Sequence, residues 1–326
     1  MHAISYVRVA DVDAALAEGI DPDSRFLAGG TTEVDMLRIG VAQERRLVDI
    51  NELPLNTIED QPDGGLLLGA LARMSTVASA PGVRQRFPMI AQALELGASA
   101  QLRNMASMGG NMIQRVRCAY FRETDMPCNK REPGSGCAAE GGFHRGHAVL
   151  GTSEHCFAAH PSDVAVPLVA LDAVIHLRGR EGERTMPLED FFLPPGDTPE
   201  REHPIEHGEL ITAIEVPAAP VARRSLYLKV RDRQSYEFAL VSVAAAATVA
   251  DGVISEVRLA LGGVATRPWR ARTAEGLLNG GPAIRDAFEA AAAAELAQAV
   301  ARPQNAFKIE LARRAIVRAL ERVTAS

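Results

Sequence analysis

The sequence predicts an α+β fold with two or three subdomains. The chain has 326 residues, more than the ~250–300 at which a single hydrophobic core usually stops growing. An apolar segment (25–28), two glycines and a segment with helical spacing (34–39) are typical of a strand–turn–helix unit. Towards the C-terminus, two apolar runs flank Asp251-Gly252, which strongly indicates a β-hairpin, and Ala-rich helical segments follow.

The N-terminal part continues with short elements. Apolar segments predict strands at 46–50 and 65–69, and the spacing of apolar residues predicts a helix at 90–96. Thr31 and Thr32 precede the 34–39 segment, where helix-capping side chains are expected.

The pattern breaks between residues 112 and 160, where Asn, Gly, Pro, Cys, His and Arg crowd together without periodicity. A structureless stretch of this length far exceeds the roughly 12–15 residues usual for loops. We therefore expect something other than an apolar core to order it. Periodicity resumes at 164–177, and the polar, Pro-rich segment 181–207 is predicted to be a loop apart from its two phenylalanines.

A Pro-rich segment at 217–220 marks the predicted start of a C-terminal domain. The hairpin strands are expected at 240–250 and 253–261. Helices are expected at 284–300, where alanine dominates, and at 307–322, whose apolar residues form one face.

Composition excludes several classes of protein. The net charge is −6, which argues against a nucleic-acid binder that relies on an overall positive field. No apolar run reaches the roughly 18–20 residues needed to cross a membrane. The first ten residues lack the pattern of a signal peptide, so a cytoplasmic protein is expected.

Two glycine segments are candidate phosphate-binding turns. Residues 27–33 place Gly29-Gly30 between a strand and a helix, and residues 107–111 contain Gly109-Gly110. Glycine lets backbone N–H groups approach a ligand closely. Neither segment matches G-x-G-x-x-G or a P-loop, and Gly-Gly pairs are also common in ordinary turns. Residue patterns alone do not pair the two segments.

All four cysteines fall within the irregular stretch, which suggests a shared ligand. Their spacing, C-x9-C-x8-C-x18-C, lacks the C-x-x-C of a zinc ribbon or a thioredoxin-type site. The residues alone leave an iron–sulfur cluster, structural zinc, and metal-free thiols or a disulfide all open. Nearby basic side chains could offset an anionic cluster; these are Arg115, Arg117, Arg122, Lys130 and Arg131.

Together these segments resemble the FAD-binding medium subunit of the molybdenum hydroxylases, a family that includes xanthine dehydrogenase, carbon monoxide dehydrogenase and aldehyde oxidoreductase. The resemblance covers essentially the whole chain. Residues 27–34 are similar to the first flavin loop, 107–111 to the second, and 160–163 to the P-x-S-D element. Residues 227–231 and 239–243 are similar to the K-x-x-R…A-x-V-S-V strand, although the Lys-to-Arg spacing is one residue shorter here.

The resemblance implies a fold and a domain division. Residues 1–219 are expected to form a two-subdomain FAD-binding domain of the vanillyl-alcohol-oxidase-like (PCMH) type, divided at about residue 54. Residues 220–326 are expected to form a small α+β domain of the CO dehydrogenase flavoprotein type, with an antiparallel sheet and helices.

The resemblance also implies a flavin site. The glycine loops would hold the FAD pyrophosphate, Asp163 would face the ribityl or isoalloxazine region, Lys229 would lie near the polar edge of the flavin, and Ile211 would pack on the ring. The full set of expected FAD-binding residues is Leu27, Ala28, Gly29, Gly30, Thr31, Thr32, Glu33, Val34, Ser107, Met108, Gly109, Gly110, Asn111, Asp163, Ile211 and Lys229. Glu237 stands where the family often has an aspartate, and its role stays open.

One departure from the family pattern is large. Residues 112–159 intervene where ordinary members have only a few residues, and they contain every cysteine. This insertion is similar to that of the branch with an extra [4Fe–4S] cluster in the flavin subunit, above all aldehyde oxidoreductase and more distantly 4-hydroxybenzoyl-CoA reductase. The resemblance therefore implies that the cluster is held by Cys118, Cys128, Cys137 and Cys156.

The function implied is electron transfer. A large subunit with a molybdenum cofactor and a small subunit with [2Fe–2S] clusters would form a heterotrimer, or its dimer, with this chain. FAD would pass electrons on to an external acceptor, and no catalytic residue is expected in this chain. Alternatives are a metal-stapled interaction subunit without flavin, a hydroxybenzoyl-CoA-reductase-like flavin subunit, and a stand-alone flavin enzyme. Export to the periplasm with a partner that carries a twin-arginine signal is the alternative location.

Overall fold

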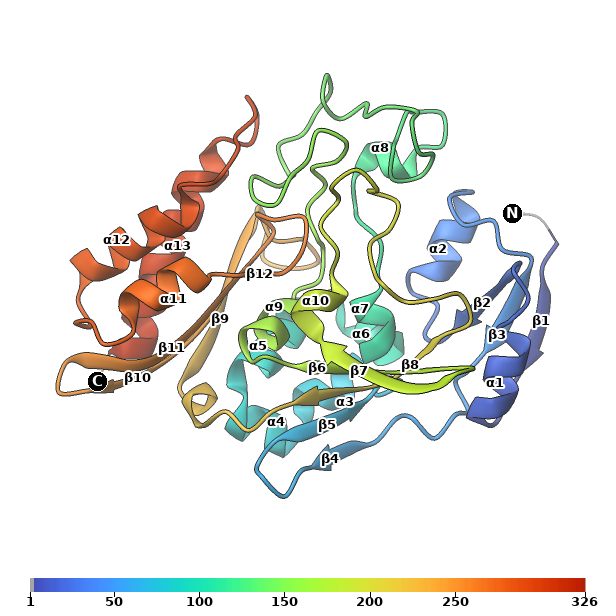
Figure 1. Cartoon of the computed structure of the whole chain (residues 1–326), viewed down its shortest axis with the longest axis horizontal. Coiled ribbons are helices and arrows are strands. Elements are labelled where there is room, and N and C mark those ends of the chain that lie inside the picture. The colour runs from blue at the N-terminus through green and yellow to red at the C-terminus, as the bar shows by residue number, and fades with distance from the viewer. Residues whose placement is uncertain (1–2, 326) are drawn as a thin grey trace.

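The structure, a computed structural model, describes residues 3–325 and contains three sheets (Figure 1). The first is a parallel sheet of order β1-β3-β2, covered by α1 (Val12–Glu18) and α2 (Glu33–Arg38). Its strands are β1 (Ser5–Arg8), β2 (Ser24–Leu27) and β3 (Arg46–Asp49). The predicted strand–turn–helix unit is thus confirmed.

The second sheet is antiparallel, of order β4-β5-β8-β6-β7. Its strands are β4 (Ile58–Asp60), β5 (Leu66–Gly69), β6 (Val174–Gly179), β7 (Gly182–Pro187) and β8 (Leu210–Val216). Its helices are α3 (Met74–Ser79), α4 (Pro81–Arg86), α5 (Pro88–Leu96), α6 (Ala100–Met105), α7 (Met108–Met112), α9 (Ala165–Ala170) and α10 (Leu188–Phe191).

Strand β7 corrects the loop expected at 181–207. It lies at the sheet edge, pairs only with β6, and exposes most of its side chains. An edge strand with water on both faces needs no alternation of apolar and polar residues, so the sequence lacks the usual strand signal.

The third sheet belongs to the C-terminal part and has the order β12-β11-β10-β9. The Asp251-Gly252 hairpin is confirmed: both residues have positive φ, as a type I′ turn requires. The strands are β9 (Ser225–Val230), β10 (Val241–Ala250), β11 (Val253–Gly262) and β12 (Trp269–Arg270), and the short 3-10 helix η1 (Pro220–Arg223) precedes them.

Residues 241–247 of strand β10 are buried on both faces, which explains why this part of the strand is almost entirely apolar. Ala244 and Ala246 belong to the core of the FAD-domain side, whereas Val243 and Ala245 pack into the core under the C-terminal helices. These helices are α11 (Arg272–Leu278), α12 (Arg285–Leu296) and α13 (Phe307–Thr324). Helix α12 ends at Leu296 rather than the expected Val300, and the backbone N–H of Val300 instead donates to Val149 O in the insertion.

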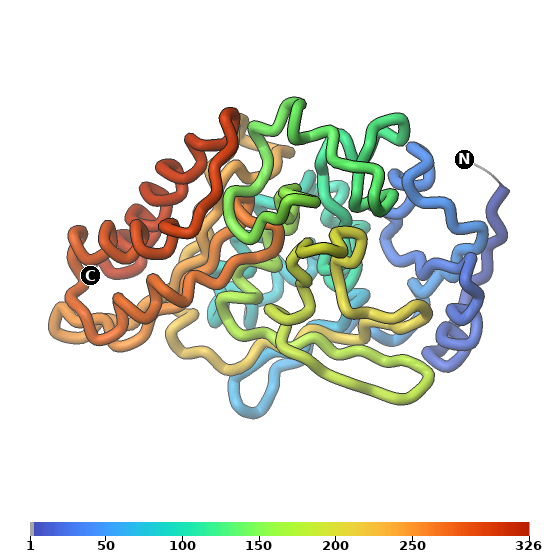
Figure 2. The backbone as a smooth tube through the Cα atoms, turned by 45° about the horizontal axis from the view of Figure 1, so that its top comes forward, coloured from blue at the N-terminus to red at the C-terminus, as the bar shows by residue number. Residues whose placement is uncertain are grey.

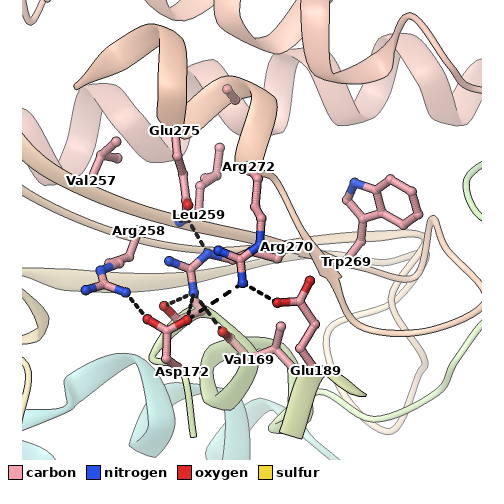
Figure 3. A network of polar contacts seen from close by, with 12 residues as sticks. Val169, Asp172, Glu189, Val257, Arg258, Leu259, Trp269, Arg270, Arg272 and Glu275 are labelled. Atoms are coloured by element: carbon pink, nitrogen blue, oxygen red, sulfur yellow. Dashed lines mark hydrogen bonds and ion pairs between the residues drawn. The ribbon is translucent and has the colours of Figure 1, made fainter. Parts of the chain in front are cut away.

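A buried ion network fastens the third sheet to the rest of the molecule (Figure 3). The Arg270 guanidinium, whose side chain is 2% exposed, pairs with Asp172 and Glu275 and donates to the carbonyls of Val169 and Ala170. Those carbonyls end helix α9, where a cation is favoured. Asp172 also pairs with Arg258 from β11.

The insertion contains only one short helix, α8 (Ala119–Arg122), as its aperiodic sequence predicts. Polar side chains hold much of the remainder. Arg131 donates to four backbone carbonyls within the insertion, and buried Lys308 of α13 donates to the carbonyls of Gly146 and His147. Figure 2 shows the insertion between α2 and the C-terminal helices, beside the segment that precedes β8.

Candidate cofactor sites

The first glycine segment lies directly against the residues that precede the second. A Cβ atom built on Gly29 would lie 1.9 Å from the carbonyl oxygen of Met105, just before the second segment. Only glycine allows this approach of two backbones. On the other side of the second segment, a Cβ on Gly109 would lie 2.9 Å from Ala70 Cβ. The two glycines thus allow each loop to pack closely against neighbouring backbone, which sequence patterns did not reveal.

The loops border a cavity of about 1090 Å³, large for a small-molecule site. Twelve of the sixteen expected FAD-binding residues line it: Ala28, Gly29, Gly30, Thr31, Thr32, Glu33, Ser107, Gly109, Gly110, Asn111, Asp163 and Ile211. We call it the flavin cavity below. Whether each residue touches the cofactor stays a prediction.

Four expected residues lie off the cavity wall. Leu27 ends strand β2, Met108 is fully buried in the core, and Val34 is 41% exposed on α2. Lys229 is buried behind Asp163 and reaches the cavity only through that carboxylate. Thr32 is a further correction: its side chain makes no capping bond, and its hydroxyl accepts from Arg117 instead.

The two ends of the insertion are tied together at the flavin cavity. The Ser162 hydroxyl donates to Asn111 Oδ1 at 2.5 Å and accepts from the backbone N–H of Ala165. The G-G-N and P-x-S-D elements therefore meet although the insertion separates them in sequence. The insertion therefore begins and ends at neighbouring positions in the fold.

Asp163 is the centre of a buried polar group at the cavity. It accepts from Lys229 Nζ at 2.8 Å and from the Tyr227 hydroxyl at 2.7 Å. Lys229 also donates to Leu96 O at 3.1 Å. Burial raises the pKa of Asp163, and the charge and hydrogen bond of Lys229 oppose that rise. Lys229 is therefore positioned to keep this carboxylate ionised at the wall of the cavity.

We expect Lys229→Met to destabilise the fold by about 2–4 kcal/mol at pH 8, because Asp163 would remain buried without its cation. The loss should shrink as the pH falls, since a carboxyl whose folded pKa is raised is protonated below that pKa. Urea unfolding at pH 5 and 8 measures this. Adding Asp163→Asn should recover much of the stability at pH 8, and no recovery would contradict the assigned pairing.

Several cavity residues were not expected from the sequence. Arg115, Arg117 and Arg122 line the flavin cavity and not the cavity beside the cysteines; their influence on an anionic cluster stays a prediction. Arg131 is engaged by backbone carbonyls, and of the five basic residues only Lys130 lines the cavity beside the cysteines. The insertion thus supplies positive charge to the flavin cavity. In the sequence these arginines are only a group of nearby basic residues, and nothing there indicates which cavity they line.

Glu237 also lines the flavin cavity, together with its neighbours Tyr236 and Phe238, which are partly exposed. Its carboxylate pairs with Arg233 at 3.4 Å, and Arg117 lies over the Phe238 ring. The loop that replaces the usual aspartate therefore still carries an acid to the cavity.

The flavin cavity presents buried polar atoms that lack hydrogen-bond partners within residues 3–325. They are Glu33 Oε1 and Arg117 Nε. Such atoms are costly unless a ligand or water satisfies them. The volume, the exposed loop backbones and these atoms together fit a large polar cofactor such as FAD.

Glu33 has a pKa raised to about 6, mainly by burial and opposed by the charge of Arg25. Between its ordinary pKa and about 6, the folded chain holds a proton that the unfolded chain has lost, so stability falls as the pH rises. We expect Glu33→Gln to stabilise the flavin-free protein by about 1–2 kcal/mol at pH 8 and by little at pH 4. Denaturant titrations at both pH values test this, and a gain of equal size at both would contradict it.

The four cysteines line one small cavity inside the insertion. Cys128 and Cys137 are cross-strand neighbours in an isolated bridge, and all four thiols are free. Burial raises the pKa of Cys118 to about 11 and also raises the pKa of Cys137 and Cys156. Binding a metal would therefore release protons here. His147 Nε2 lies 3.3 Å from Cys118 Sγ, and burial lowers the pKa of this histidine to about 4.

Within the described chain, no three His, Cys, Asp or Glu side chains converge closely enough to hold a single metal ion. A zinc ion needs its sulfur ligands at about 2.3 Å. The thiols line a cavity of about 10 Å³, the space of about one water, so a [4Fe–4S] cluster would require the loops that carry them to move apart.

Comparison with known proteins identifies the family to which this chain belongs. Residues 2–219 match the FAD binding domain in molybdopterin dehydrogenase, and residues 226–323 match the CO dehydrogenase flavoprotein C-terminal domain. The chain belongs to the family of FAD-binding medium subunits of the xanthine dehydrogenase and CO dehydrogenase type. Members of this family are oxidoreductase subunits, and the expected fold class and FAD binding agree with it.

Individual relatives are similar over most of their length. The chain is 45% identical over 323 residues, 98% of both chains, to the aldehyde oxidoreductase FAD-binding subunit PaoB of Escherichia coli. It is 30% identical to the glyceraldehyde dehydrogenase medium chain of Sulfolobus acidocaldarius, covering 83% of this chain and 79% of the relative. A chain of carbon monoxide dehydrogenase from Hydrogenophaga pseudoflava superposes with a TM-score of 0.77 at 26% identity, covering 99% and 98%.

None of the helices described is long and apolar enough to span a membrane.

Proposed function

We propose that this chain is the FAD and [4Fe–4S] electron-transfer subunit of a heterotrimeric molybdenum-containing hydroxylase of the aldehyde oxidoreductase type. The main support is the full-length similarity to a subunit named for aldehyde oxidoreductase and FAD binding. Its partners would be a large molybdenum-cofactor subunit and a small [2Fe–2S] subunit, in a heterotrimer or its dimer. The relatives named as medium chains fit such an assembly.

We further propose the domain division at residues 219 and 220, with an insertion at 112–159. The proposed location is the cytoplasm, with export in complex with a signal-bearing partner as the alternative. The external electron acceptor is left undefined by this proposal.

Bound FAD would accept electrons singly or in pairs and pass them to an outside acceptor. The chain's own share is positioning and electrostatics. The loops at 28–33 and 107–111 would hold the cofactor, Asp163 with Lys229 would set the charge beside it, and Ile211 would supply an apolar contact. Arginines from the insertion would add positive charge around the anionic parts of FAD.

The cluster proposal is supported by the four cysteines that line one cavity and by the resemblance of the insertion. Four cysteine thiolates are the usual ligands of a [4Fe–4S] cluster. Cys118, Cys128, Cys137 and Cys156 would supply them. Because the insertion has little regular structure, the cluster would also serve to order it.

Cofactor analysis of the full chain, purified without oxygen, tests the proposal. We expect a flavin absorbance band, FAD in the denatured extract, and about four iron and four acid-labile sulfide per chain. Cys156→Ser should lose most iron and sulfide but keep FAD. As a matched control, Glu154→Ala in the same loop should keep both, because Glu154 is exposed.

Other outcomes assign the alternatives. Zinc without sulfide would establish structural zinc, and metal without any flavin would establish the flavin-free interaction subunit. Co-purification of the molybdenum and [2Fe–2S] subunits tests the assembly separately from the cofactors.

A further inference from the structure

Lys130 is a buried lysine in the insertion with two partners outside it. Its side chain is 7% exposed, and its Nζ donates to Pro199 O at 2.6 Å. The same Nζ lies 3.3 Å from Glu202 Oε1. Both partners belong to the segment before β8, which runs beside the insertion (Figure 1). Lys130 therefore joins the insertion to the body of the FAD domain by charge.

Glu202 carries this contact into the flavin cavity. Its side chain is 14% exposed and lines the cavity together with Arg115, with which it forms an ion pair. The contact joins Arg115 Nε directly to Glu202 Oε2. Glu202 is thus a buried carboxylate at the cavity wall, and it depends on two cations for its charge balance.

Lys130 also faces the cysteines. It lines the cavity that all four cysteines share, and it lines a small neighbouring cavity with Cys156, Glu202 and His203. Glu202 and His203 in turn line the flavin cavity. Lys130 therefore borders the cysteine cavity, and Glu202 borders the flavin cavity. Because the two side chains are largely buried and lie close together, their electrostatic interaction is strong.

We propose that Lys130 and Glu202 form a charge bridge between the cysteine cavity and the flavin cavity, in which Lys130 is a positioning residue for FAD. This inference rests on the proposed function because FAD is its ligand. Lys130 does not line the flavin cavity, so it acts through Glu202 by neutralising a carboxylate that would otherwise repel the anionic cofactor. Coulomb repulsion in a partly buried site remains appreciable beyond direct contact.

Four variants of the full chain test the bridge: Lys130→Gln, Glu202→Gln, their double variant, and Arg145→Gln as a control. Arg145 lies in the same insertion but pairs with exposed Asp232, away from both cavities. FAD affinity is measured by flavin fluorescence, and the flavin midpoint potential by anaerobic titration. K130Q should raise the Kd for FAD by about threefold to tenfold and lower the midpoint potential. R145Q should change the Kd by less than about twofold.

The double variant separates charge from damage to the fold. When Glu202 is already neutral, K130Q should leave the Kd within about twofold of that of E202Q alone. A persistent loss in the double variant would assign Lys130 a merely structural role and overturn the bridge. If K130Q alone fails to fold, the same comparison between the double variant and E202Q decides the question.

The outcomes distinguish this inference from the proposed function. Wild-type protein that binds FAD while K130Q stays within twofold of it would overturn the bridge alone. Wild-type protein without affinity for FAD would overturn both.

Discussion

Gly29→Ala is expected to lower FAD affinity by more than about a hundredfold. The new Cβ would lie 1.9 Å from Met105 O and 2.6 Å from Met105 C. Both are backbone atoms, so no rotamer change can relieve the overlap, and the first glycine loop must move away from the end of α6, which leads into the second loop. Because both loops line the flavin cavity, their separation opens its wall.

Titration of flavin-free full chain with FAD measures the effect, and a thermal melt shows whether the rest of the fold survives. Gly141→Ala is the matched control, since a Cβ there meets nothing within 4 Å. It should leave both FAD affinity and the melting temperature nearly unchanged. A Gly29→Ala protein that binds FAD within tenfold of wild type would show that FAD binding does not need this close approach.

Arg270→Met is expected to destabilise the protein by about 3–5 kcal/mol, because it removes one partner from a buried ion network. Glu275, also buried, would lose its cation, and two carbonyls at the end of α9 would lose a donor. This network fastens the C-terminal sheet to the FAD domain (Figure 3), so we expect loosening at that interface.

Guanidinium unfolding measures the loss, and Arg272→Met is the control. Arg272 also reaches Asp172 and Glu189, but its side chain is 60% exposed. Exposed ion pairs contribute about 0–1 kcal/mol, so this control should cost little. The double variant Arg270→Met with Glu275→Gln should recover part of the stability. Equal costs for the two arginines would contradict a special role for the buried one.

Local patterns predicted the elements whose signals are local. The hairpin at Asp251-Gly252 needs positive φ at two adjacent positions, and Asp-Gly is a residue pair that adopts this conformation readily. Strand β7 shows the limit, since an exposed edge strand has no periodic burial to detect. Helix α12 shows another limit: Ala-rich propensity continues past Leu296, but the chain turns there to pair with the insertion.

The candidate sites divide in the same way. The residues alone pointed to two glycine turns and to four grouped cysteines, whereas Asp163 and the flavin role of the turns came from the resemblance to the family. The sequence did not reveal that Arg115, Arg117 and Arg122 line the flavin cavity, because nearness in sequence is a poor guide to direction within an irregular segment. It also could not place Glu202 beside Lys130, since those residues are far apart in the chain.

By itself, then, the sequence determined the fold class, the flavin loops and the existence of a cysteine-bearing insertion. These follow from local backbone requirements and from motifs of short range. Only the tertiary structure showed that Gly29 allows the backbone of Met105 to approach closely, and that Lys229 is buried behind Asp163. It also showed that arginines of the insertion line the flavin cavity. Each of these depends on long-range packing, in which burial and charge pairing between distant segments fix where a side chain points.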